Sequence, residues 1–334
     1  MKLSVLIKTF NEAKKIGPCL ESVLAATAAY RDDTEIVVAD SLSTDQTVEL
    51  AKAYPVRVVQ LVHPGDRGCG AGVQLGFQYA LGEFIYLLDG DMQVQPGFIS
   101  QALAVLQSDS KLAGVAGLLE DTEVRNWFDR HRVKNRPAAI AGNADWLAGG
   151  GLYRRQAIKD AGGYAGDRNL KAYEEADLGL RLKSLGWRLV RLPILAVRHT
   201  GHQASTFDVI LSLWSSGRAA AGGVLLKSAI GRPWLFRCVR MFLHPLGVLA
   251  YWLTGFVSLF IAPWLLLVWA LVGLTVFVAL LIRKTSFVDA GLSVLLWHMV
   301  AVGIIVGMGR ARLPPEQPIE SIEVYNASTT ATSS

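Results

Sequence analysis

The sequence has few cysteines and few charged residues for its length. Its 334 residues include three cysteines, Cys19, Cys69 and Cys238, which show no metal-ligand spacing. This pattern excludes a disulfide scaffold and predicts reduced thiols, as in the cytosol. Charged residues make up 18% of the chain and hydrophobic residues 51%. Such a composition excludes a disordered or collagen-like chain and predicts that part of the chain lies in lipid.

Charge is also missing from one long stretch near the end of the chain. Residues 241–308 contain three formal charges, Arg283, Lys284 and Asp289. Residues 244–261 and 263–282 would each form a helix of roughly 27–30 Å, which is close to the thickness of a bilayer core. Residues 288–308 are a candidate for a further span. The sequence therefore predicts a transmembrane region of two to three helices.

The segment before this tract is basic. Five basic residues and no acidic residue lie between positions 218 and 240. By the positive-inside rule, the first 240 residues are expected to face the cytoplasm, with the chain as a multi-pass protein of the cytoplasmic membrane. A basic segment beside an apolar tract favours anionic lipid headgroups as its partner, and nucleic acid is not expected.

Up to residue 205, short apolar runs alternate with segments of helical spacing. Strands are expected at residues 3–9, 35–39, 56–61, 84–88 and 112–117, and helices at 12–29, 44–53 and 70–81. This alternation predicts an α/β domain with a Rossmann-like, mostly parallel sheet that is covered by helices on both faces. The predicted order is an α/β domain (1–205), a basic amphipathic interfacial segment (206–240), the transmembrane region (241–308) and a flexible polar tail (309–334).

Ligands of such sheets bind at the carboxyl ends of the strands, so the polar residues after each strand are candidates. Thr9, Asn11 and Glu12 follow the first strand, and Asp40 ends the second. Asp40 could hold ribose hydroxyls or a base edge. The alternative for Asn11 is that it caps the next helix. A glycine-rich stretch, residues 65–72, matches neither of the common nucleotide-binding fingerprints and reads equally well as a flexible loop.

Asp89, Gly90 and Asp91 follow an apolar strand and give the strongest signal. Two carboxylates this close repel each other, and burial raises the cost. A divalent cation removes the repulsion, and oxygen ligands suit Mg²⁺ or Mn²⁺. The alternative is a solvated turn without a metal. His199, at the end of another apolar run, is a further candidate ligand.

Glu174, Glu175 and Asp177 open a predicted helix. Acidic residues in a first helical turn are stabilised by the helix dipole, so a capping role is the simple interpretation. The functional interpretation makes one of them a general base. Residues alone leave the choice among the three open.

Taken in order, these motifs resemble the family 2 glycosyltransferases, the inverting group with the GT-A fold, over residues 2–205. The resemblance implies that Thr9, Asn11, Glu12, Asp40, Asp89 and Gly90 bind a nucleotide sugar. It implies that Asp89 and Asp91 hold the metal in a DxD motif, and that Glu175 is the catalytic base, with Glu174 and Asp177 as alternates. The chain departs from the family pattern at Lys8, usually Pro, at Leu42, usually Gly, and at Glu175, usually Asp. The Gln-x-x-Arg-Trp element of processive synthases does not follow the domain.

The expected function is therefore metal-dependent transfer of a single sugar, in synthesis of a cell-surface polysaccharide or glycolipid. The donor would be a UDP-sugar, with a GDP-sugar as the second choice, and the acceptor would be lipid-linked because of the membrane tract. Two alternatives remain open: a polyprenyl-phosphate sugar synthase of the dolichyl-phosphate-mannose-synthase type, and a non-catalytic membrane scaffold that binds nucleotide sugars.

Overall fold

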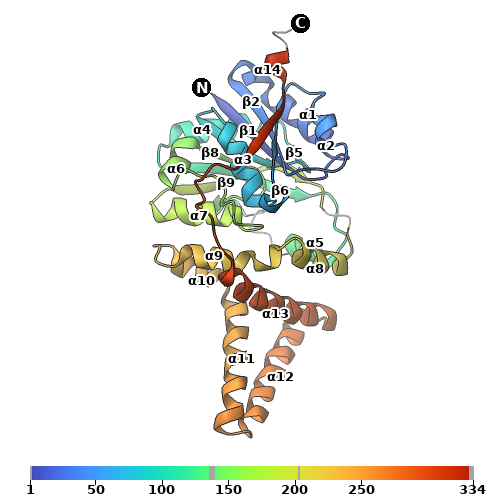
Figure 1. The fold of residues 1–334 in the computed structure, drawn as a ribbon, viewed down its shortest axis with the longest axis vertical. Coiled ribbons are helices and arrows are strands. Elements are labelled where there is room, and N and C mark those ends of the chain that lie inside the picture. The colour runs from blue at the N-terminus through green and yellow to red at the C-terminus, as the bar shows by residue number, and fades with distance from the viewer. Residues whose placement is uncertain (1, 135–139, 202–203, 331–334) are drawn as a thin grey trace. The chain divides into compact units, whose positions relative to one another are not determined.

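The computed structural model describes residues 2–134, 140–201 and 204–330. The chain forms two compact units: Met1–Ser215 together with Arg312–Ser334, and Ser216–Ala311. The first unit is built around one mixed sheet, whose strands are ordered β10-β3-β2-β1-β4-β8-β6-β9-β5, with β7 paired to β9 (Figure 1). The second unit is entirely helical among the residues described here.

The strands of the first unit are β1 (Leu3–Thr9), β2 (Thr34–Asp40), β3 (Arg57–Leu61), β4 (Phe84–Asp89), β5 (Met92–Val94), β6 (Leu112–Asp121), β7 (Gly142–Asn143), β8 (Gly151–Arg154), β9 (Arg188–His199) and β10 (Ser321–Asn326). Its helices are α1 (Ile16–Thr27), α2 (Thr47–Ala51), α3 (Cys69–Tyr79), α4 (Phe98–Ser108), α5 (Trp127–Lys134), α6 (Arg155–Asp160), α7 (Glu174–Ser184), α8 (Thr206–Ser215) and α14 (Ala327–Thr330), with 3₁₀ turns η1 (Ala28–Asp33) and η2 (Pro64–Asp66). The expected α/β architecture is confirmed.

β1 lies in the middle of the parallel part of the sheet. It pairs with β2 and with β4, both in parallel register. Side chains alternate between the two faces, because successive residues of a strand point in opposite directions. Val5 and Ile7 pack into a core with α1, α2 and α4, whereas Leu6 packs into a second core with α3, α6 and α7. Lys8 is on the same face as Leu6, which directs it toward α7.

The prediction of a flexible tail at residues 309–334 is wrong for most of this segment. β10 pairs antiparallel with β3 and becomes the edge strand of the sheet. Ile319 is 2% exposed in the second core, and Gln78 in α3 exchanges two hydrogen bonds with the Ile319 backbone, at 3.1 Å and 2.6 Å. Arg312 forms an ion pair with the buried Asp167. The tail is polar because an edge strand keeps one face in water, not because it lacks structure.

The second unit contains η4 (Arg218–Ala220), α9 (Ala221–Ala229), α10 (Leu235–Met241), α11 (Leu243–Ile261), α12 (Leu265–Lys284) and α13 (Phe287–Gly309). α11, α12 and α13 are each long and apolar enough to cross a membrane. α11 and α12 form an antiparallel hairpin, in which Tyr251 stacks on Trp269 with ring centroids 4.4 Å apart. Figure 1 shows α13 running crosswise to this hairpin. The helices predicted at residues 244–261, 263–282 and 288–308 begin and end within two residues of α11, α12 and α13. The predicted interfacial segment, residues 206–240, is divided between the two units.

Candidate active site

The carboxyl ends of β1 and β4 bring a lysine against the first acidic residue of the Asp-Gly-Asp motif. Lys8 and Asp89 are direct neighbours in the parallel register, and Lys8 Nζ lies 3.2 Å from Asp89 Oδ1. The same ammonium also contacts the Glu174 carboxylate at the start of α7. Burial would lower the pKa of Lys8, but the negative charges of Asp89 and Glu174 raise it well above its ordinary value. Lys8 is therefore a fixed cation within an acidic cluster.

The glycine between the two aspartates allows a close approach of backbone to β1. A Cβ atom at Gly90 would lie 2.8 Å from Thr9 Cγ2, and Gly90 N donates to Lys8 O at 3.0 Å. A larger residue at this position would collide with the Thr9 side chain. Gly90 therefore holds the motif against the strand that carries Thr9.

Asp40 lies at the end of β2 and is fully buried. It accepts hydrogen bonds from Thr9 Oγ1 at 3.0 Å and from Gln60 Nε2 at 2.8 Å. Ser43 adds two more, from its backbone N at 2.8 Å and its Oγ at 2.5 Å. These four bonds fix the turn after β2 in place. Gln60 is a partner of Asp40 that the sequence analysis missed.

The loops after β1 and β2 are joined by further hydrogen bonds. Thr44 N donates to Asn11 Oδ1, and Asn11 N donates to Ser43 Oγ, both at 2.8 Å. Glu12 N donates to Thr47 Oγ1 at 2.8 Å. Asn11 has a φ of 56°, and it does not cap α1, whose N-cap position is Lys15. The predicted nucleotide-binding residues Thr9, Asn11 and Glu12 therefore lie together at the carboxyl end of β1, against the loop that follows β2.

Leu42, where the family usually has glycine, adopts a φ of 61°. Residues other than glycine rarely adopt this left-handed backbone conformation. Arg67 in the glycine-rich stretch holds the turn, because its Nη2 donates to Leu42 O at 2.8 Å and its Nε to Ser41 O at 3.0 Å. The guanidinium also lies over the ring of Phe10, 4.9 Å from the centroid. The stretch 65–72 thus has a structural role in supporting the β2 turn.

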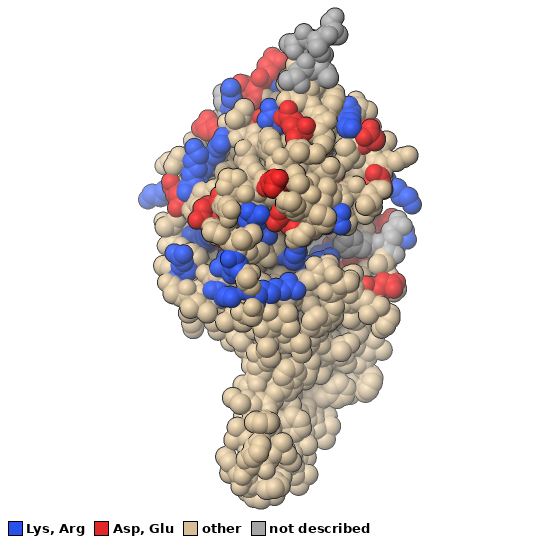
Figure 2. All heavy atoms as spheres, in the orientation of Figure 1, with Lys and Arg blue, Asp and Glu red and all other residues tan. Residues whose placement is uncertain are grey.

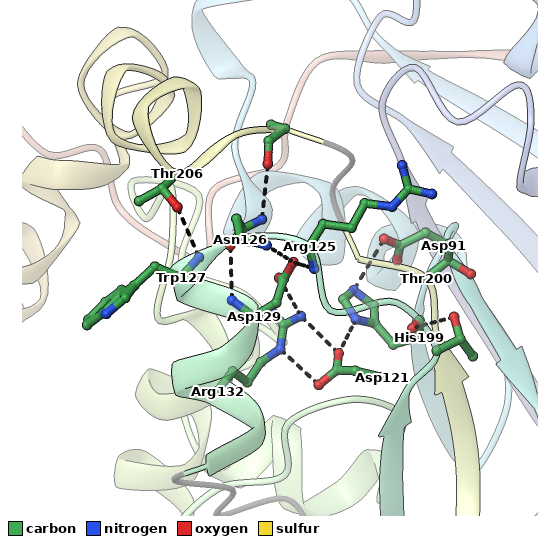
Figure 3. Close-up of polar contacts among 12 residues, drawn as sticks. Asp91, Asp121, Arg125, Asn126, Trp127, Asp129, Arg132, His199, Thr200 and Thr206 are labelled. Carbon is green, nitrogen blue, oxygen red and sulfur yellow. Dashed lines mark hydrogen bonds and ion pairs between the residues drawn. The ribbon is translucent and has the colours of Figure 1, made fainter. Parts of the chain in front are cut away.

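The second aspartate of the motif faces His199. β5 pairs antiparallel with the end of β9, and this pairing places His199 Nε2 at 3.3 Å from Asp91 Oδ2 (Figure 3). The other ring nitrogen, Nδ1, lies 2.8 Å from Asp121 Oδ1 at the end of β6. Burial lowers the pKa of His199, but the hydrogen bonds to Asp121 and Asp91 outweigh it and raise the pKa to about 9. Asp121 was not singled out in the sequence, because β6 and β9 meet only in the folded sheet.

A polar network that includes Arg132 and Asp129 holds the Asp121 side chain in place. Arg132 in α5 contacts Asp121 Oδ1 at 2.9 Å and Asp129 Oδ1 at 3.1 Å. Asp129 Oδ2 in turn accepts from Asn126 N at 3.4 Å, and Asn126 Oδ1 accepts from Asp129 N at 3.0 Å, which is a reciprocal cap at the start of α5. Figure 3 shows these groups pointing toward one another. The network fixes the orientation of His199 relative to Asp91.

The three acidic residues of α7 have different surroundings. Asp177 is 1% exposed and forms an ion pair with Arg181, whose Nε lies 2.8 Å from Asp177 Oδ2. Glu174 is held by Lys8. Glu174 and Glu175 line the same pocket, together with Lys8, Asp89, Leu87 and Gly150. Asp177 is engaged in the helix packing, which leaves the two glutamates facing the pocket.

Glu175 has the most unusual electrostatic environment of the three. Burial and the neighbouring Glu174 charge raise its pKa to about 8, although Lys8 acts in the opposite direction. A carboxyl with a raised pKa is a stronger base when ionised, and such groups are typical of acid–base catalysis. Chemically, the pocket combines the carboxyl groups of Asp89, Glu174 and Glu175 with the fixed cation of Lys8.

The residues around the Asp-Gly-Asp motif suit a divalent cation in type. Asp89 and Asp91 offer carboxylate oxygens, and a histidine whose Nδ1 bonds a carboxylate directs Nε2 toward a neighbouring metal. The described residues do not contain a ready-made cluster of three metal-ligating side chains. Lys15 Nζ lies 3.6 Å from Asp91 Oδ2 and occupies part of the space beside it. The donor set fits a cation that is completed by oxygens of a bound ligand.

Comparison with known proteins finds relatives by sequence. Residues 4–162 match the family model described as glycosyl transferase family 2. The dodecaprenyl-phosphate galacturonate synthase of Rhizobium johnstonii is 33% identical over 113 residues, covering 32% of this chain and 33% of that protein. The putative glycosyltransferase EpsH of Bacillus subtilis is 26% identical over 168 residues, covering 47% and 48%. The chain thus spans a third to a half of the length of these relatives.

Solved structures share the fold. The mannosyltransferase PcManGT from Pyrobaculum calidifontis, in complex with GDP-Man and Mn²⁺, superposes with a TM-score of 0.60 at 18% identity, over 92% of this chain and 87% of that one. Residues 1–349 of TarS from S. aureus, in complex with UDP-GlcNAc, give a TM-score of 0.54 at 20% identity, over 70% and 68%. The first unit therefore has the GT-A fold, and residues 4–162 of the chain match the model of glycosyl transferase family 2.

Proposed function

We propose that the chain is a membrane-anchored, inverting glycosyltransferase that moves one sugar from a nucleotide sugar to a lipid-linked acceptor. One observation carries the proposal: Asp89 and the paired glutamates Glu174 and Glu175 line a single pocket at the carboxyl ends of β1 and β4. This is where open α/β sheets bind ligands. The match of residues 4–162 to the family model and the apolar helices support the proposal.

In this proposal Glu175 removes the proton of the acceptor hydroxyl as that oxygen attacks the anomeric carbon. The bond from this carbon to the diphosphate breaks on the opposite face, and the nucleoside diphosphate leaves with the bonding electrons. Glu174 cannot easily share this role, because Lys8 already holds its carboxylate. Thr9, Asn11 and Glu12 would lie at the nucleoside end of the site, and the buried Asp40 would hold Thr9 and the turn after β2 in place behind them.

Asp89 and Asp91 would hold Mg²⁺ or Mn²⁺, with His199 as a third ligand and the donor diphosphate completing the shell. The bound cation would neutralise the charge that develops on the leaving diphosphate. His199 must lose its proton to ligate, so metal binding and deprotonation of this ring would be linked. Lys8 and Lys15 would stay beside the diphosphate as additional positive charges.

Polyprenyl-phosphate sugar synthesis is the second candidate. It is favoured by two relatives: the galacturonate synthase above, and the undecaprenyl-phosphate 4-deoxy-4-formamido-L-arabinose transferase of Edwardsiella ictaluri, which is 26% identical over 132 residues. In that reaction the acceptor is a phosphate oxygen, which carries no proton at neutral pH. Glu175 would then matter less than in transfer to a hydroxyl.

The test is an assay of nucleoside diphosphate release by the full chain in lipid vesicles. UDP- and GDP-sugars are supplied with Mn²⁺, and the acceptor is either a polyprenyl phosphate or a polyprenyl-diphosphate-linked glycan. Acceptor-dependent release with the glycan supports the proposal, whereas release with polyprenyl phosphate alone supports the second candidate. Donor binding without any release from either acceptor would favour a scaffold and overturn both.

Asp89→Asn and Asp91→Asn test the metal assignment. Each substitution keeps the side-chain volume but removes one of the two carboxylates. Both variants should fold and lose transfer. Full activity of both variants after chelation of divalent cations would exclude the metal assignment and leave the nucleotide-sugar assignment to stand on the release assay.

A further inference from the structure

The chain leaves the first unit after Ser215 and returns to it at Arg312. The returning segment is built into the sheet and not merely laid upon it. Tyr79 OH lies 3.0 Å from Ser321 Oγ, Arg57 Nε lies 3.0 Å from Glu323 Oε2, and Asn169 contacts Leu313 through two bonds of 2.9 Å. Residues 1–215 and 312–330 must therefore lie on the same side of any membrane.

This connection restricts how often the segment between them can cross. A chain that leaves one side and returns to the same side crosses an even number of times. Three helices, α11, α12 and α13, are long and apolar enough to span. If all three crossed, Arg312 would lie on the far side, away from the buried Asp167 with which it pairs. One of the three helices therefore does not cross.

We propose that α11 and α12 cross the bilayer as a hairpin, and that α13 lies along the membrane surface on the side of the catalytic domain. The proposal is independent of the catalytic assignment. It commits the apolar surface of the hairpin to lipid, and it places both the start and the end of α13 on one side.

The charges support this choice of helices. The sequence has no Lys, Arg, Asp or Glu from residue 241 to residue 282, and the end of the hairpin shows no charged side chain in the view of Figure 2. Arg237 and Arg240 precede α11, and Arg283 and Lys284 end α12. Basic residues thus stand at both open ends of the hairpin and none stands at its turn. By the positive-inside rule this is the pattern of two spans.

The packing of α13 also differs from that of a third span. Its ring contacts with the hairpin involve His244, Trp252 and Phe277, which all lie away from the turn at residues 262–264. Its other face meets η4 and α9 at backbone distance: a Cβ at Gly303 would lie 2.0 Å from Ala219 O, and one at Gly307 would lie 2.1 Å from Ala220 O. α13 is therefore held between the open end of the hairpin and short helices that do not span.

Four crossings would also be an even number. They would require residues 206–229, a bent pair of apolar helices, to cross as one broken span. α9 has nine residues and is about 14 Å long, far less than a bilayer core. Four crossings would also place Arg232, Arg237, Arg240, Arg283 and Lys284 on the side opposite the catalytic domain. The charge pattern opposes that arrangement.

Labelling of cysteines introduced one at a time into the full chain tests the proposal. Reporters are placed at Ser110→Cys in the catalytic domain, Ala262→Cys at the hairpin turn, Thr285→Cys between α12 and α13, and Glu316→Cys after α13. Thr285 already has a φ of 54°, so cysteine adds no new backbone strain there. Each variant is treated with a membrane-impermeant maleimide in sealed vesicles of either orientation. The wild-type chain is the blank, and detergent-opened vesicles give the total.

Residues 110, 285 and 316 should label from one side and residue 262 from the other. Labelling of Glu316→Cys from the side opposite Ser110→Cys would mean an odd number of crossings and would overturn the proposal. Labelling of Thr285→Cys opposite Ser110→Cys would mean that α13 crosses. Labelling of Ala262→Cys together with Ser110→Cys would show that α11 does not cross. Either of these results would also overturn it.

Discussion

Lys8 Nζ lies 3.2 Å from Asp89 Oδ1, so the first acidic residue of the Asp-Gly-Asp motif has a protein cation as its neighbour. The same ammonium reaches Glu174, on the far wall of the pocket. Lys8, near the end of β1, therefore connects the Asp-Gly-Asp motif with α7, the helix that carries the proposed base. Its charge offsets part of the repulsion among the carboxylates, which would otherwise be costly in a buried site.

Glu175→Gln should lose turnover and keep donor binding. The amide has nearly the same shape as the carboxyl but cannot accept the acceptor proton. Loss of a general base typically slows a reaction by about 10²–10⁴-fold. Turnover is measured as nucleoside diphosphate release, and donor affinity by calorimetry. Equal activity of Glu175→Gln and wild type would remove Glu175 from the mechanism.

Asp177→Asn is the matched control on the same helix, and it should act on stability. Asp177 and Arg181 are both almost fully buried, so the substitution leaves Arg181 without its ionic partner. Breaking a buried ion pair costs about 3–5 kcal/mol. Thermal melting should show a clear loss of stability in Asp177→Asn and little change in Glu175→Gln. A stable but inactive Asp177→Asn would instead move the base two residues along.

The rate should depend on pH through Glu175. Burial and the Glu174 charge raise its pKa to about 8, and the base acts only when it has lost its proton. The value of kcat/KM should therefore rise with pH on a limb centred near pH 8. A limb in the ordinary range of glutamate, or the same limb in the residual activity of Glu175→Gln, would contradict the assignment.

Lys8→Met should move this limb to higher pH. The positive charge of Lys8 lowers the pKa of Glu175, so its removal raises that pKa further, by roughly one to three units for a close opposite charge. Lys8→Arg keeps the charge and should leave the limb near its wild-type position. A limb that stays in place in Lys8→Met would show that Lys8 does not act on the base.

Ile319→Ala tests the docking of the tail. Its side chain is 2% exposed, and truncation of a buried isoleucine costs about 2–5 kcal/mol. Ile322→Ala is the control, because Ile322 is 50% exposed on β10 and its truncation should change stability by less than about 0.5 kcal/mol. Thermal melting of the full chain compares the two. Equal, small effects would mean that the tail is not packed on the sheet.

Much of the central sheet could be predicted because its strands are continuous apolar runs. Residues 3–9 and 84–88 were expected as strands, and the structure has β1 at Leu3–Thr9 and β4 at Phe84–Asp89. β10 could not be predicted in this way. Its sequence is Ser-Ile-Glu-Val-Tyr-Asn, and as an edge strand it buries few side chains, so its pairing with β3 is set by the backbone.

The positions of candidate site residues were predictable where a motif directly follows a strand, as at Asp89 at the end of β4. They were less predictable where partners come from distant strands. His199 was a candidate, but its contact with Asp121 depends on the register of β6 and β9, which contains several irregularities. Lys8 was noted as a departure from the family pattern, and its contacts with Asp89 and Glu174 give that departure a physical meaning.

The edge strand β10 also sets an order of events during synthesis. A chain emerges from the ribosome N-terminus first, and domains tend to fold as they emerge. Here the strand that covers β3 is made after α11, α12 and α13. Until then β3 exposes a row of unpaired backbone groups, which invites wrong pairing. The catalytic sheet is therefore completed only after the apolar helices have been synthesised, and a ribosome that stalls within them leaves an open sheet behind.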